Sequence, residues 1–420
     1  MYVRSGWTIA HPGDSSHAQP AQRIELGVVS PGARPRAVGG QSLYGARVST
    51  SEPTSAAPVD TVRQGAPAGK VGPWLAECLG DPRWRECTLS PIGDGRSNLT
   101  FQVRSAAGSV VLRRPPLGGV AATAHDMGRE RTVLSALAST AVPVPAVLGG
   151  QSDSELLGAP FYVMELVEGT VPAGDAGEVW ASNPAVRRSA GAAMVDVLAD
   201  LHNVDPASVG LGEFGRPEGF MARQVRRWST QWETWRDGLA AASGTSGSRP
   251  ELTRLAERLT DAVPESSAVA IVHGDYRLEN LIFNVDRPEE VSAVLDWEMS
   301  TLGDPLADVG LMFIYWHQEH EQPLWRAAQV LPSVTRLPGF CTRMQLLERY
   351  AVRCDRDPAE LEQVLQFYVG FGAFKLAVVL AGVAARANAG AADARTAAGV
   401  LTALEPLVTL GHHVLDQGVG

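Results

Sequence analysis

The chain has 420 residues, 45% of them hydrophobic, and a formal net charge of −10 at pH 7. A chain of this length is too long for one compact core and predicts two or three folding units. The acidic balance argues against nonspecific nucleic-acid binding, which needs clustered positive charge. It also gives no reason to expect docking on an anionic membrane, so neither nucleic acid nor a membrane is an expected partner.

Cysteine usage and apolar runs limit the protein further. The four cysteines form no C-x-x-C pair and have no histidine at zinc-ligand spacing, so neither a disulfide framework nor a zinc site is expected (Cys78, Cys87, Cys341, Cys354). No apolar run approaches the length of a membrane span, and the N-terminus lacks the continuous apolar stretch of a secretory signal. We therefore expect a soluble, cytoplasmic protein. The sequence makes no prediction of its oligomeric state.

The first 70 residues differ in composition from the rest of the chain. They are rich in Gly and Pro and show no sustained period of 2 or 3.6 residues, which predicts a disordered N-terminal extension over 1–70. A short helix is expected from residue 71. The pattern then predicts three strands, one helix and two further strands, in the order 86–92, 99–104, 109–114, 125–138, 142–148 and 160–167.

The region after these strands is mostly helical in pattern. Two long helices, two apolar β-rich segments and a helical stretch to the end are predicted at 183–202, 219–240, 269–273, 291–297 and 304–420. We therefore predict an α+β fold of two lobes. The smaller lobe would comprise a five-stranded antiparallel sheet and a helix over 71–167, and the larger, mainly helical lobe would cover 168–420. A cleft between two lobes is a favoured place for a ligand.

The segment HGDYRLEN has the spacing of a kinase catalytic loop, in which an aspartate is followed five residues later by an asparagine. Asp275 is the candidate catalytic base, because the attacking hydroxyl must give up its proton. Asn280 would turn back from the end of the same loop to hold a magnesium ion. Arg277 either contacts the transferred phosphoryl group or a negatively charged substrate, or it forms an ion pair with Glu279 or Glu298.

Asp296 lies sixteen residues after Asn280, at the end of the apolar run VSAVLD. Its carboxylate would emerge where the predicted strand ends. Magnesium prefers oxygen ligands and keeps several waters, so Asp296, Asn280 and ATP phosphates would satisfy it. The alternative is that Asp275 and Asp296 are ordinary turn or cap residues. The combined spacing favours phosphoryl transfer that depends on ATP and Mg²⁺.

These motifs resemble the aminoglycoside phosphotransferase and choline kinase superfamily, which has a protein-kinase-like fold. Four stretches, VLRRPP, PFYVME, HGDYRLEN and GDPLAD, are similar to one subgroup, the kinase-like domain of acyl-CoA dehydrogenase family members 10 and 11. The resemblance covers about residues 72–390. It implies a nucleotide-binding N-terminal lobe, and a C-terminal lobe with the catalytic loop and the acceptor pocket.

The nucleotide end of the cleft combines residue patterns with this resemblance. The turn after the first strand has glycines that allow close approach to phosphate and polar side chains that can donate to it (Gly93, Gly95, Ser97, Asn98). Arg113 stands where protein kinases carry a strand lysine, and the resemblance implies that it binds phosphate. Arg114 would point to the other face and reach solvent; the alternative is that both are surface arginines on a strand. Glu130 resembles the helix glutamate that orients the strand cation; an exposed surface glutamate is the alternative.

The stretch MELV resembles the kinase hinge, where adenine would bond to backbone groups. The candidates around the ring are Val111, Met164, Glu165 and Val167, although buried strand packing predicts the same residue types. Asp308, near the start of a predicted helix, is expected to tie the catalytic loop down, a structural rather than a catalytic role.

The sequence thus favours a small-molecule kinase that phosphorylates a hydroxyl group. The subgroup resemblance favours a hydroxyacyl acceptor, a hydroxy acid or its CoA thioester; an aminoglycoside or another metabolite is the alternative. A protein kinase is less favoured because only seven residues separate Asp296 from Asp304 and no Ala-Pro-Glu motif follows. The retained Asp275, Asn280 and Asp296 argue against a pseudokinase.

Overall fold

The computed structural model describes residues 65–92, 98–117, 126–172, 183–239, 248–266, 268–331, 333–388 and 394–419. The predicted N-terminal extension lies outside them, except for its last six residues. There Ala66 is fully buried, and helix α2 (Ala68–Cys78) begins. The packed structure therefore starts a few residues before the predicted boundary at 70.

A five-stranded antiparallel sheet follows α2, as predicted. Its order is β1-β2-β3-β5-β4, with β1 (Cys87–Pro91), β2 (Leu99–Ser105), β3 (Gly108–Arg114), β4 (Val147–Gln151) and β5 (Phe161–Glu165). The strand predicted over 142–148 begins only at Val147. The physical reason is that Pro143 and Pro145 have no N–H to donate to a ladder.

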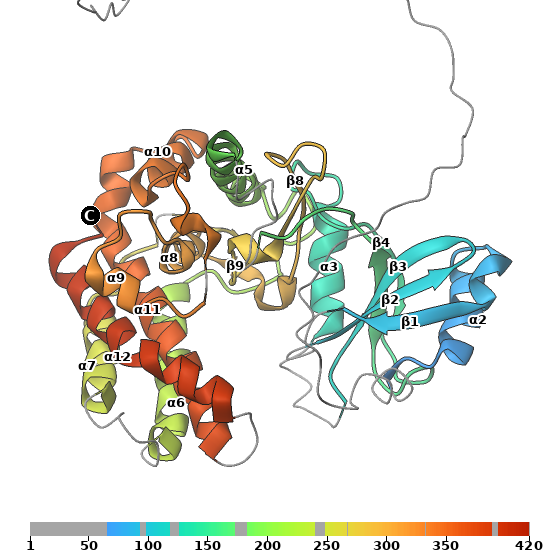
Figure 1. Ribbon diagram of the computed structural model, residues 1–420, viewed down its shortest axis with the longest axis horizontal. Coiled ribbons are helices and arrows are strands. Elements are labelled where there is room, and N and C mark those ends of the chain that lie inside the picture. Colours follow the sequence, from blue (N-terminus) through green and yellow to red (C-terminus); the bar gives the residue numbers. More distant parts are fainter. Residues whose placement is uncertain are drawn as a thin grey trace, which may run out of the picture. The chain divides into compact units, whose positions relative to one another are not determined.

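The two faces of the sheet carry separate apolar clusters, because successive residues of a strand point to opposite faces. Val110 and Leu112 pack with α2 in one cluster. Val111 and Met164 belong to the other, together with residues of helix α3 (Met127–Leu137). The two helices lie on opposite sides of the sheet (Figure 1). Arg113 alternates with Leu112 and therefore points to the α3 side.

Arg114 does not reach solvent, contrary to the expectation. Its side chain is buried, and its Nη1 donates to the carbonyl oxygens of Gly65 (2.5 Å) and Leu157 (3.1 Å), while its Nε donates to that of Pro115 (3.0 Å). The chain just before α2 covers this part of the sheet. The guanidinium can be buried because backbone carbonyls accept its hydrogen bonds.

We expect Arg114→Met to lower the free energy of unfolding by about 2–4 kcal/mol, because the carbonyls of Gly65 and Leu157 would stay buried without their donor. Denaturant unfolding measures the change. Arg104→Met, on the neighbouring strand, is the matched control; Arg104 is exposed and its replacement should cost less than about 0.5 kcal/mol. Equal stability of the two variants would contradict the buried role of Arg114.

The remainder of the chain is mainly helical, also as predicted. Asn183 begins the first long helix, because its side chain accepts from the N–H groups of Ala185 and Val186 and Pro184 occupies the first turn. The helices in order are α5 (Pro184–His202), α6 (Phe220–Leu239), α7 (Ser248–Asp261), α8 (Leu306–Tyr315), α9 (Pro323–Ala327), α10 (Arg343–Arg353), α11 (Pro358–Asn388) and α12 (Ala394–Gln417).

Helix α11 is the central element of this helical region, in contact with α6, α8 and α12 (Figure 1). Among the residues described, it is the one helix long and apolar enough to cross a membrane. The expectation that no apolar run approaches the length of a membrane span is therefore wrong. However, 83% of its apolar window is buried inside the protein. A helix that is apolar all round is the composition expected of a core helix.

Two short antiparallel sheets of two strands each interrupt the helices and hold the segments that carry the catalytic motifs. Strand β6 (Ala270–Val272) pairs with β9 (Thr301–Gly303), and β7 (Leu281–Phe283) pairs with β8 (Val291–Val294). The HGDYRLEN segment runs from the end of β6 through a 3₁₀ turn, η2 (Leu278–Asn280), into β7. Asp296 lies between β8 and a second turn, η3 (Trp297–Met299).

Candidate active site

The loop that carries Asp275 needs glycine at the position before it. Gly274 has a φ of +86°, and a Cβ at this residue would lie 2.8 Å from both the Cβ and the carbonyl oxygen of Met299. Any other side chain would be strained by its backbone conformation and would clash with that residue. This explains the glycine of the HGD motif.

His273 links the loop to the segment that contains Asp296. It is fully buried, its Nε2 lies 2.9 Å from the carbonyl oxygen of Leu295, and its ring packs against that of Trp297. Because its ring nitrogen is engaged by a backbone group, His273 has a positioning role. The loop and the β8 end are therefore held together from inside the protein.

Asp308 ties the loop to helix α8, as the sequence predicted. Its two carboxylate oxygens accept from the backbone N–H groups of His273 (2.7 Å) and Gly274 (2.8 Å), and His202 lies 3.3 Å away. Burial alone would raise the pKa of Asp308, but His202 and the loop N–H group outweigh burial and lower this pKa. The buried carboxylate stays ionised and fixes the backbone just before Asp275.

Asp275 itself is partly exposed, with 26% of its side chain accessible. Its Oδ2 lies 3.2 Å from Nδ2 of Asn280 and 3.4 Å from Nε of Arg277. The guanidinium of Arg277 also lies over the ring of Tyr315, 5.1 Å from its centroid. Arg277 thus meets Asp275, an ion-pair partner that the sequence pattern did not indicate. The carboxylate is oriented by its own loop and remains open on one side.

Asn280 and Asp296, the predicted metal ligands, lie on segments joined by a hydrogen bond. The N–H of Leu295 donates to the carbonyl oxygen of Asn280 at 2.8 Å, which places η2 beside the end of β8. Asn280 is buried, while the side chain of Asp296 is 30% exposed. Asp296 has φ and ψ of 65° and 58°, a left-handed conformation that few residues other than Gly, Asn and Asp adopt.

Arg113 brings the sheet into this site. Its Nε lies 3.0 Å from the carboxylate of Glu130, and its Nη2 lies 2.5 Å from Oδ1 of Asp296 and 3.9 Å from Oε2 of Glu298. Glu130 is only 2% exposed, so it is not the surface glutamate considered as the alternative. Arg113, Glu130 and Asp296 are therefore brought together, from three separate elements.

The cluster contains one guanidinium and three carboxylates. Burial raises the pKa of Glu130 to about 7, although Arg113 acts in the opposite direction. Burial alone would lower the pKa of Arg113, but the charges of Glu130 and Asp296 help to raise it. The guanidinium is thus charged, and the carboxylates carry the surplus negative charge.

A divalent cation would balance this surplus, and carboxylate and amide oxygens suit Mg²⁺. The residues present therefore fit a magnesium ion. The described residues hold no group of three His, Cys, Asp or Glu that could bind a metal ion. Asn280 and Asp296 would thus need the oxygens of a bound nucleotide to complete the shell.

Glu130 should make the stability of the protein depend on pH. Because its pKa is about 7 in the folded protein against 4.5 ordinarily, the folded state holds this proton more tightly. The contribution is full below about pH 4.5 and is lost as the pH rises through 7, by at most about 3 kcal/mol. Denaturant unfolding between pH 5 and 8 measures it. Glu130→Gln should lack this slope, and Glu257→Gln, at an exposed position of α7, should keep it. Identical slopes in both variants would contradict the prediction.

The predicted phosphate-binding turn lies mostly outside the described residues, which include neither Gly93, Gly95 nor Ser97. Asn98, next to β2, is buried, and its Nδ2 donates to Oε2 of Glu298 at 3.0 Å. Its Oδ1 is buried too and has no hydrogen-bond partner in the part of the chain that the structure describes. Asn98 therefore reaches the carboxylate cluster from the start of β2.

The predicted hinge residues begin at the end of β5. Val111 and Met164 are cross-strand neighbours and both are buried, which fits an adenine contact and core packing equally. The N–H of Glu165 already donates to the carbonyl oxygen of Ala146 at 2.9 Å, and its side chain is exposed. We therefore propose Val167, two residues past the strand, as the adenine-binding hinge position.

Two residues close to Asp275 have no counterpart in the sequence predictions. Lys375 of α11 donates from Nζ to the carbonyl oxygen of Gly274 at 2.7 Å, and Tyr315 of α8 lies against Arg277. Both come from helices far along the chain, so motif spacing could not find them. The one available signal for Lys375 was its rarity, because the chain contains only two lysines.

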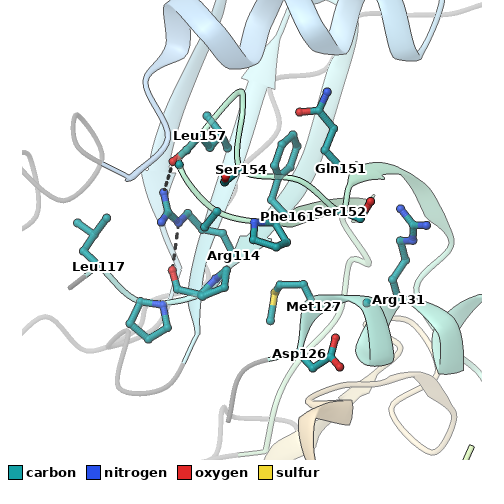
Figure 2. A pocket seen from close by; sticks show the side chains of 16 residues that line it. Arg114, Leu117, Asp126, Met127, Arg131, Gln151, Ser152, Ser154, Leu157 and Phe161 are labelled. Carbon is teal, nitrogen blue, oxygen red and sulfur yellow. Dashed lines mark hydrogen bonds between the residues drawn. The ribbon is translucent and has the colours of Figure 1, made fainter. Parts of the chain in front are cut away.

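Two cavities of similar size lie in this part of the molecule. One, of about 620 Å³, is lined by residues such as Arg114, Met127 and Phe161 at the end of β3 and the start of β5 (Figure 2). It contains no predicted site residue. The second, of about 510 Å³, is lined by Gly274 of the catalytic loop and by Lys375. This second cavity is therefore the one that borders the candidate chemistry.

The model of the phosphotransferase enzyme family matches residues 88–331, a span that includes Arg113, Asp275 and Asp296. The chain belongs to this family. Acyl-CoA dehydrogenase family member 10 of Mus musculus is 34% identical over 331 residues, which cover 79% of this chain and 29% of that protein. Acyl-CoA dehydrogenase family member 11 of Gallus gallus is 33% identical over 353 residues, which cover 82% of this chain and 43% of that protein. The chain spans less than half the length of these relatives, and the predicted subgroup resemblance is confirmed.

Solved structures of this phosphotransferase fold agree. A protein of Ralstonia eutropha JMP134 named as an aminoglycoside phosphotransferase is 28% identical, with a TM-score of 0.65 over 84% of this chain and 98% of its own. Choline kinase of Cryptosporidium parvum has a TM-score of 0.57 at 11% identity, over 81% of this chain and 94% of its own. A mutant of aminoglycoside phosphotransferase APH(4)-Ia, in complex with ADP and hygromycin B, has a TM-score of 0.52 at 17% identity. The match covers 81% of this chain and 99% of that one. The predicted two-lobe, kinase-like α+β fold is confirmed.

Proposed function

We propose that the protein transfers the terminal phosphoryl group of Mg-ATP to a hydroxyl of a small molecule, with a hydroxyacyl compound as the acceptor. The observation that supports the chemistry is the meeting of Asp275, Asn280 and Asp296 with Arg113 at one place between sheet and helices. Nucleotide use is supported by the ADP complex of the APH(4)-Ia neighbour. The acceptor class is supported by the similarity to acyl-CoA dehydrogenase family members.

Each residue has a role in this proposal. Asp275 accepts the proton of the acceptor hydroxyl as that oxygen bonds to the γ-phosphorus and ADP leaves. Asn280 and Asp296 hold the magnesium ion, which when bound offsets the negative charge of the phosphates. Arg113 turns from Asp296 to a phosphate when the nucleotide enters, and Glu130 keeps the guanidinium oriented. Positioning and electrostatics therefore supply most of the catalysis.

Release of ADP from Mg-ATP, measured with a panel of acceptors, tests the proposal. The panel contains hydroxy acids and their CoA thioesters, with hygromycin B and choline for comparison. We expect ADP release to require both an acceptor and Mg²⁺, and mass spectrometry to find the phosphorylated hydroxyacyl product. Inert hydroxyacyl compounds beside an active aminoglycoside would reject the acceptor class. ADP release by no acceptor at all would reject the kinase assignment.

A further inference from the structure

The cavity beside the catalytic loop has a charge opposite to that of the chain as a whole. Besides apolar groups, it is lined by five cationic side chains from α3, α6, α11 and the segment before α6: Arg129, Arg216, Arg223, Arg227 and Lys375. Within the described part of the chain, none of these five has a carboxylate within the 4.0 Å of an ion pair. This is unusual for a protein with a net charge of −10, in which acidic partners are plentiful.

The cavity also has three acidic residues, but each is engaged elsewhere. Asp126 accepts from the backbone N–H of Arg129 at the start of α3. Glu298 accepts from Asn98 at the start of β2. Asp308 accepts from the backbone of the catalytic loop. Against five cations, these three carboxylates leave the lining of the cavity with a surplus of two positive charges.

The five cations differ in how far they are already used. Arg129 donates to the carbonyl oxygens of Phe214 and Ser300, and Arg223 donates to two carbonyl oxygens in the segment before α6. By contrast, the exposed side chains of Arg216 and Arg227 make no hydrogen bond or ion pair to any described residue. Arg216 and Arg227 are thus available to a ligand.

Lys375 is the cation closest to the chemistry. Its Nζ binds the carbonyl oxygen of Gly274, the residue before Asp275, and lies 5.5 Å from the ring centroid of Trp228. Burial lowers the pKa of Lys375, while the charges of Asp275 and Asp308 act in the opposite direction. A bound anion would favour the charged ammonium. Given the bond lengths of one residue, Lys375 Nζ lies within about 10 Å of the Asp275 carboxylate.

We infer that this cavity binds an anionic group of the phosphoryl acceptor, a carboxylate or a phosphate, on Arg216, Arg227 and Lys375. This inference rests on the proposed function and narrows its acceptor to acids. An anion at Lys375 would leave the acceptor hydroxyl a few bonds away, beside Asp275. A polycationic acceptor would meet like charges here and would be disfavoured.

Acceptors that differ only in charge test the inference. The positional isomers 2-, 3- and 4-hydroxybutyrate vary the distance between carboxylate and hydroxyl, and their methyl esters remove the charge. We expect kcat/KM, measured by ADP release, to be at least about tenfold higher for the best acid than for its ester. CoA thioesters of the same acids replace the carboxylate by the phosphates of the carrier. The phosphates of CoA lie many bonds from the acyl hydroxyl, so turnover of the thioesters without that of the free acids would overturn an anion site beside Lys375.

Variants of the two exposed arginines locate the binding site. Arg216→Ala and Arg227→Ala should each raise KM for the anionic acceptor about tenfold or more, while kcat and the affinity for a non-hydrolysable ATP analogue stay unchanged. Arg226→Ala is the matched control, because Arg226 is also exposed on α6 but does not line the cavity. It should keep the wild-type KM. Equal effects of Arg226→Ala and Arg227→Ala would overturn the assigned site.

The outcomes separate this inference from the proposed function. If the esters, choline or hygromycin B are turned over as well as the acids, the protein is still a kinase but the anion site is rejected. If no acceptor releases ADP, the proposed function is rejected. In that case calorimetry tests whether the cavity binds anions at all. The three hydroxybutyrates and CoA are titrated into the wild-type protein and into Arg227→Ala. The absence of binding to the wild-type protein would reject the anion site as well.

Discussion

Replacement of Asp275 by Asn is expected to lower the rate of phosphoryl transfer by about 10²–10⁴-fold while leaving nucleotide affinity nearly unchanged. Asparagine has the shape of aspartate and can still meet the side chains of Asn280 and Arg277, which lie 3.2 Å and 3.4 Å from the native carboxylate. It cannot accept a proton. The loop is held by Asp308 and Lys375 through its backbone, so the substitution should not disturb its fold.

Two measurements separate chemistry from binding in this variant. Turnover is followed as ADP release, and nucleotide affinity is measured by calorimetry with a non-hydrolysable ATP analogue and Mg²⁺. Asp286→Asn, at an exposed position after β7, is the control for a change of one charge near the loop, and it should keep wild-type turnover. Wild-type turnover in Asp275→Asn would mean that another group is the base.

Replacement of Asp296 by Asn is expected to remove the dependence of nucleotide binding on Mg²⁺ and to lower turnover by about 10²–10³-fold. The native carboxylate contacts Arg113 at 2.5 Å, and the backbone N–H of the preceding residue, Leu295, donates to the carbonyl oxygen of Asn280. The variant loses the negative charge that would hold the metal ion. It also loses the charge that pairs with the Arg113 guanidinium when no metal ion is bound. Asparagine tolerates the left-handed backbone of this position, so the effect should come from the charge and not from strain.

Asp355 provides a matched control for this variant. It is the other described residue apart from glycine with a positive φ, at 52°, and it is exposed at the end of α10. Asp355→Asn makes the same change at a residue that also has a positive φ, outside the candidate site, and should leave turnover unchanged. Calorimetric titration of the ATP analogue with and without Mg²⁺ measures the coupling. An undiminished Mg²⁺ effect in Asp296→Asn would contradict its role as a ligand.

The sequence predicted the elements that rest on local patterns. Alternation and turn residues predicted the five strands, and the spacing of Asp275, Asn280 and Asp296 predicted segments that the structure brings together. Chain spacing carries this information because a loop between two strands has few ways to place its polar residues. The resemblance of four short motifs added the family, which the match over residues 88–331 confirms.

Predictions failed where burial depends on distant parts of the chain. Arg114 was expected in solvent, yet the carbonyl oxygens of Gly65 and Leu157 accept its hydrogen bonds from far along the sequence. Lys375 reaches the catalytic loop from a helix one hundred residues later. No local pattern signals such contacts, because tertiary packing alone decides them. The roles assigned to individual site residues stay predictions that the variants above can test.

The position of α11 in the chain bears on how the protein is made. The helix starts at Pro358, but α6 and α8 pack against it, and its Lys375 holds the loop of Asp275. A nascent polypeptide that has left the ribosome only as far as residue 357 therefore exposes apolar helix surfaces and has no supported catalytic loop. Helix α11 emerges after α6 and α8, which pack against it, so chaperones can bind the exposed apolar surfaces until α11 packs in place.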